Sequence, residues 1–125
     1  MTTAPTDAHL AALLEKATRA VFTERSGRAR AQGERLLLVV ENADLGSLRE
    51  AMRLAPGPGG HCMCAGDLEL TISGADICET IGVHHGYTLR WHGPWEWPDV
   101  AFAEPERFIR WLADRGYDRY LVERA

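Results

Sequence analysis

Hydrophobic positions recur at helical spacing in three parts of the chain. The stripe nearest the N-terminus consists of Leu10, Leu13, Leu14, Ala17 and Val21. It predicts a first helix over residues 7–31, because the arginines and glycines that follow the stripe suit a helix C-terminus. A short second helix is predicted over residues 45–55. A last helix is predicted over residues 104–115, because Pro105 suits a first turn and Gly116 a C-terminal stop.

Strand patterns lie between these helices. Residues 36–40 are continuously apolar, which predicts a strand covered on both faces. Alternating apolar and polar residues predict a half-buried strand over residues 67–73 and another over residues 87–92. Turn-forming residues at 73–76 favour an antiparallel hairpin whose second strand begins at Ile77. Residues 55–60 and 93–98 are rich in proline and glycine, and we expect loops there.

The predicted order of elements is α-β-α-β-β-β-α. Strands that follow one another after the second helix are typical of an α+β fold, with helices packed on one face of a largely antiparallel sheet. A length of 125 residues suits a single domain over residues 1–125, in which residues 1–5 form a loose lead-in.

Charge and composition exclude several classes of protein. A net charge of −4 argues against general binding to nucleic acids or anionic membranes, since both need a basic surface. The longest strongly apolar run, residues 36–40, is far shorter than the roughly 20 residues of a membrane-spanning helix. Charged residues near the N-terminus do not fit a secretory signal. Three cysteines are an odd number and too few for a disulfide scaffold, so we expect a cytoplasmic setting.

Two cysteines and two histidines form the chemically distinctive part of the sequence. Cys62 and Cys64 precede one predicted strand, and His84 and His85 end its partner. Thiolates and imidazoles are the ligands that zinc prefers. If strand alternation continues, both cysteines face the core, His85 points inward with them, and His84 points to the opposite face. The pattern therefore predicts a zinc site built from Cys62, Cys64 and His85.

The fourth ligand of this site is left open. His84 could supply it if the turn before Gly86 bends, and His61 and His92 are weaker candidates. A water in the fourth position would make the site catalytic, because zinc lowers the pKa of bound water to about 7. Arg90 is then the candidate for holding an anionic group, although it also fits an outward charge on its strand. Copper(I) is the competing metal, since thiolates and the nearby thioether of Met63 are soft ligands.

Two other functions fit the same residues. In a non-enzymatic interaction module, Trp95 and Trp97 would form the contact loop for a protein partner, and the cysteines would belong to the core. In a thiol redox protein, Cys62 and Cys64 would be the reactive pair. The redox function is disfavoured because an extended Cys-x-Cys separates its Cα atoms by roughly 6.6–6.8 Å, the upper edge of disulfide geometry. Cys78 has the wrong strand parity to join either site.

The second half of the chain resembles a group of small uncharacterised bacterial proteins. Their pattern is Cys-Met-Cys-x-Gly-Asp, then His-His-Gly-x-Ser-Leu-Arg-Trp, then a downstream Trp-Leu, which this chain matches from Cys62 to Asp67, from His84 to Trp91 and at Trp111. Thr88 replaces the serine of the pattern and keeps its hydroxyl. The resemblance implies that the cysteines, the paired histidines and Arg90 belong to one site, and it implies no particular reaction.

Overall fold

The computed structural model describes residues 5–24, 35–57, 67–91 and 99–123. Its strands are β1 (Arg19–Glu24), β2 (Arg35–Glu41), β3 (Leu68–Ser73), β4 (Cys78–His84), β5 (Thr88–Trp91) and β6 (Val100–Ala101). Its helices are α1 (Asp7–Lys16), α3 (Ala43–Ala51), α4 (Pro105–Ala113) and α5 (Arg119–Glu123).

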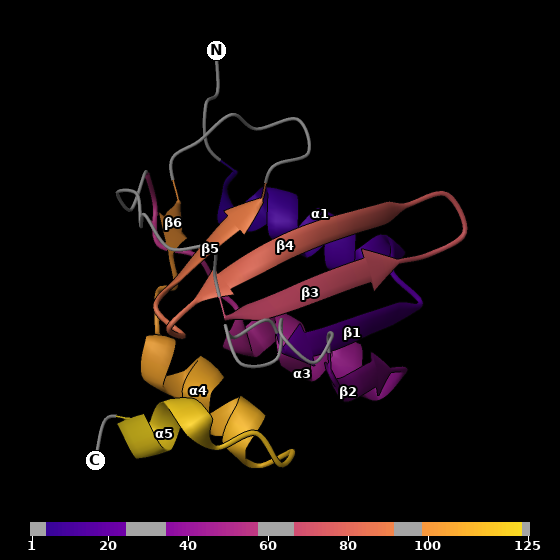
Figure 1. The fold of residues 1–125 in the computed structure, drawn as a ribbon. Helices are drawn as coiled ribbons and strands as arrows, with labels where there is room; N and C mark the ends of the chain where they lie inside the picture. Colours follow the sequence, from indigo (N-terminus) through magenta and orange to yellow (C-terminus); the bar gives the residue numbers. More distant parts are fainter. Residues whose placement is uncertain (1–4, 25–34, 58–66, 92–98, 124–125) are drawn as a thin grey trace.

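The strands form one antiparallel sheet in the order β2-β1-β3-β4-β5-β6. Figure 1 shows α1 and α3 behind this sheet, and α4 and α5 at the end where β3 begins and β4 ends. The predicted α+β fold, with helices on one face of an antiparallel sheet, is confirmed. None of the helices described is long and apolar enough to cross a membrane.

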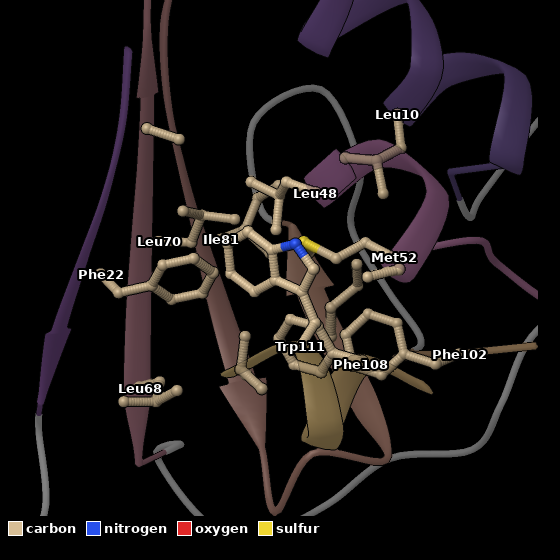
Figure 2. Packing of buried hydrophobic residues seen from close by; sticks show 14 of the residues in the cluster. Leu10, Phe22, Leu48, Met52, Leu68, Leu70, Ile81, Phe102, Phe108 and Trp111 are labelled. Carbon is tan, nitrogen blue, oxygen red and sulfur yellow. The ribbon is translucent and has the colours of Figure 1, made fainter. Parts of the chain in front are cut away.

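The core lies between the sheet and the helices. Figure 2 shows side chains from the strands on one side meeting those of α3 and α4 on the other. Phe108 of α4 is fully buried, and its ring centroid lies 6.2 Å from that of Phe22 and 4.7 Å from that of Phe102. The strand alternation predicted for β3 is confirmed, because every second residue from Leu68 to Ile72 is buried.

The first helix is shorter than predicted. It ends at Lys16, Ala17 is already extended, and the stripe residue Val21 lies in β1. This part of the prediction is wrong because β1 lies between β2 and β3 and forms a hydrogen-bonded ladder with each of them. Pairing on both sides outweighs a local helical pattern. Residues 25–31 of the predicted helix lie outside the described residues.

The apolar run at 36–40 does form a strand, but β2 is not covered on both faces. It is the outermost strand described next to β1, and Leu36 and Val39 are 62% and 36% exposed. A continuous apolar run cannot by itself distinguish an edge strand from a central one. The short helix after β2 and the last helix are confirmed as α3 and α4, whereas the short elements β6 and α5 were not predicted.

Candidate functional site

His84 is the last residue of β4 and is 2% exposed. Ile81 and Val83 are buried on the face that the helices cover, and alternation places His84 on the opposite face, as predicted. Its ring lies beside Gly82, where a Cβ atom would be 3.7 Å from the imidazole Nε2. A buried imidazole on the face away from the helices is unusual for a sheet, since that face commonly meets water.

His85 leaves the strand and begins the turn to β5. Its φ is +57° and that of Gly86 is +76°, and the backbone N–H of Tyr87 donates to the His84 carbonyl over 3.0 Å. His85 is exposed. The prediction that His85 points inward is therefore wrong, because β4 ends one residue earlier and strand alternation no longer applies.

Asp67 ties this turn to the start of β3. The backbone N–H of His85 donates to Asp67 Oδ1 over 3.0 Å. The same carboxylate lies near two buried tyrosines of the C-terminal segment. Burial raises the pKa of Tyr117 to about 12 and raises the pKa of Tyr120 further, and the charge of Asp67 acts in the same direction on both. Asp67 thus lies between the histidine turn and the segment that carries Tyr117 and Tyr120.

Arg90 forms a two-point ion pair with Asp99. Its Nε lies 2.7 Å from Asp99 Oδ1 and its Nη2 lies 3.1 Å from Oδ2. The Asp99 side chain is 1% exposed and that of Arg90 is 15% exposed, so the pair is largely desolvated. Its position follows from the sheet, since Arg90 is the register partner of Gly82, the residue beside the His84 ring. Arg90 is therefore not a simple outward charge; its role in holding an anionic group stays a prediction.

Burial is the main influence on the protonation of His84. It lowers the pKa of the imidazole, Arg90 and His85 act in the same direction, and Asp99 and Asp67 act against them. His84 is consequently neutral at pH 7, and one of its ring nitrogens carries a lone pair. A neutral, buried imidazole can accept a hydrogen bond, take up a proton or coordinate a metal.

His84 lies in the middle of a row of residues that crosses the sheet. Leu68 pairs with Val83, so Asp67 is level with His84, which pairs with Thr88, which in turn pairs with Ala101. At the far end of this row the N–H of Ala55 donates to the Ala101 carbonyl over 2.9 Å. The chain segment between Ala55 and Asp67 therefore begins and ends on the row that contains His84.

Several residues singled out from the sequence lie outside the described residues: Cys62, Cys64, His61, His92, Trp95 and Trp97. Cys78 is exposed at the start of β4, at the opposite end of the strand from His84. In the part of the chain that the structure describes, there is no group of three or more His, Cys, Asp or Glu side chains that could hold a metal ion. The described members of the predicted site are thus His84, His85 and Arg90.

Asp99 was missed by sequence reasoning. It stands alone before a two-residue strand, and only the pairing of β5 with β6 brings it beside Arg90. Tyr117 and Tyr120 were also missed, because nothing in the local sequence links them to Asp67 or to the histidine turn.

Comparisons with known proteins add no relative: no known family, curated protein or solved structure matches the chain.

Proposed function

We propose that this protein binds a transition metal ion, zinc foremost, through Cys62, Cys64 and His84, with His85 as the candidate for a fourth ligand. His84 takes the leading place among the two imidazoles because it is buried and neutral, whereas His85 is exposed. Imidazole binds zinc in its neutral form.

The observation that carries the proposal is the position of the two ends of the cysteine-bearing segment. At one end of the row, Ala55 is hydrogen-bonded to Ala101 of β6. At the other end, Asp67 is level with His84, so that β4, β5 and β6 lie between Ala55 and Asp67. Four strand spacings separate these ends, about 19 Å, whereas twelve residues of extended chain reach about 40 Å. The segment thus has length to spare for reaching the imidazole of His84.

The distance along the chain from Asp67 supports the same proposal. Cys64 is three residues before Asp67, so covalent geometry alone keeps the two Cα atoms within about 11 Å of each other. Asp67 in turn holds the backbone of His85. Cys62 is two residues further away and has the same side-chain chemistry. A reducing cytoplasmic compartment would keep both thiols available as ligands.

Metal content is the decisive test of this function. The full chain, purified without added metal, should contain zinc or copper in near-stoichiometric amount by elemental analysis. The double change Cys62→Ser and Cys64→Ser should remove the metal, and Cys78→Ser is the matched control that should retain it. Metal-free wild-type protein, or metal retained by the double variant, would refute the proposal.

Cobalt substitution tests which ligands are used. Cobalt(II) bound by thiolates has an intense charge-transfer band, which the cysteine double variant should lose. His84→Asn should weaken cobalt binding more than His85→Asn does, because the buried ring is the proposed ligand. Equal behaviour of the two histidine variants would contradict the leading role given to His84. If no metal binds and mild oxidation removes two titratable thiols, the redox function replaces this one.

A further inference from the structure

A carboxylate and a guanidinium are buried together on the sheet face that His84 occupies. Asp99 is 1% exposed, and Arg90 contacts both of its oxygens. Burying a charge is costly unless it is paired and hydrogen-bonded, and this pair lies on the face away from the helices rather than in the main core. The position of the pair therefore calls for an explanation beyond packing.

The sheet register brings this pair to the ring of His84. The imidazole lies over Gly82 of β4, and Arg90 is next to Gly82 on β5. Asp99 lies beyond Arg90, immediately before β6, and is ion-paired with it. A Cβ built at Gly82 would lie 3.7 Å from the imidazole Nε2, an ordinary van der Waals distance, so the ring is in contact with this row of the sheet. Among the negative charges that act on His84, that of Asp99 acts most strongly.

We propose that Asp99, held in a fixed orientation by Arg90, is a positioning residue for the imidazole of His84. A carboxylate that accepts a ring N–H fixes the tautomer and the orientation of a histidine, and leaves the other ring nitrogen available for a ligand. Two parallel bonds from a guanidinium fix the plane of the carboxylate in turn. The inference rests on the proposed function, in which His84 is a metal ligand.

The chain contains a second pair of the same kind that serves as a control. Arg115 Nε lies 3.0 Å from Asp44 Oδ2, and its Nη2 lies 2.8 Å from Oδ1. This pair joins the turn after α4 to α3, and neither residue is among the groups that shift the pKa of His84. Asp44→Asn therefore removes a two-point arginine–aspartate pair without touching the proposed site.

The test compares Asp99→Asn with Asp44→Asn in the full chain, using two measurements. The first is the tautomer of His84 in the metal-free protein, read from the nitrogen chemical shifts of the ring. The second is zinc affinity, measured by competition with a chelating dye. Asp99→Asn should change the tautomer populations and weaken zinc binding by about 10–100-fold, the usual effect of losing such a partner. Asp44→Asn should leave both unchanged.

A folded Asp99→Asn variant with the wild-type tautomer would overturn the inference. If this variant does not fold, Arg90→Lys keeps the carboxylate and the positive charge and removes only the two-point contact; a single, unchanged tautomer in that variant would equally overturn it. If wild-type protein binds no zinc, the proposed function fails, and the tautomer comparison in metal-free protein still decides whether Asp99 positions His84.

Discussion

Replacing Gly86 by alanine should destabilise the protein strongly, because two features of the turn require glycine. Gly86 has a φ of +76°, and a Cβ there would lie 3.0 Å from Ile109 Cγ1 and 3.1 Å from Tyr120 Cδ2. Both distances are shorter than ordinary van der Waals contacts. The turn that carries the histidines is thus packed closely against α4 and α5, and a methyl group there would require these side chains to shift.

The size of the effect follows from these two features. A left-handed backbone costs an L-residue about 1–2 kcal/mol, and an extra methyl group in a packed site costs about 1–3 kcal/mol. Alanine recovers about 0.5–1 kcal/mol through the smaller entropy of its unfolded chain. The free energy of unfolding should therefore fall by about 1–4.5 kcal/mol, which lowers the melting temperature by roughly 3–22 °C in a domain of this length.

Urea denaturation of the metal-free protein measures this change, and Gly46→Ala is the matched control. Gly46 lies in α3, and nothing is within 4 Å of a Cβ built there. The same substitution should stabilise the protein at this position by about 0.5–1 kcal/mol, because alanine favours a helix. The reasoning is refuted if Gly86→Ala is as stable as wild type, or if both variants change stability in the same direction.

Three further predictions concern the residues around the site and the core. His85→Gly should stabilise the protein by up to about 1.5 kcal/mol in urea denaturation, because glycine adopts a positive φ without strain but has a larger entropy cost of folding. A loss of stability would show that the His85 side chain makes a contact worth more than the strain. The pKa of His84 is lowered in the folded protein, so the unfolded chain takes up this proton first as the pH falls below about 6.5. Stability should then decrease from that pH toward the lowered pKa, and melting curves of His84→Gln should show a shallower decrease between about pH 7 and pH 5; equal slopes would contradict the prediction. Ser47→Ala removes the hydroxyl that accepts the Trp111 indole N–H over 2.7 Å, and the free energy of unfolding should fall by about 1–3 kcal/mol because a buried donor is left unpaired. Tryptophan fluorescence during unfolding measures this loss, and an unchanged midpoint would mean that water replaces the serine.

The sequence predicted the parts of the fold that local pattern controls. The alternation in β3, the hairpin turn at Ser73 and the proline start of α4 are all local, and all three were correct. β1 was missed because the stripe of α1 continues through Val21 without a break, and the partners that make this segment a strand are β2 and a strand some fifty residues later.

Among the residues selected for the site, the orientation predicted for His84 is correct and the one predicted for His85 is wrong. Alternation misplaced His85 because nothing in the residues marks β4 as ending at His84 rather than at the next position. Two consecutive residues with positive φ make the turn, and only the second of them is a glycine. Asp99 could not be found from sequence, since its importance comes from a cross-strand pairing and from burial.

The pairing of β1 with β3 has a consequence for how the chain folds while it is being synthesised. The β1–β2 hairpin is complete once Glu41 has emerged, but the other side of β1 must wait for Ser73, the partner of Arg19. At ordinary rates of translation this delay lasts roughly two to six seconds. Throughout it, one edge of β1 has no partner strand, and Phe22, which is fully buried in the finished fold, is not yet covered by Phe108 of α4, so this interval exposes the chain to misassembly.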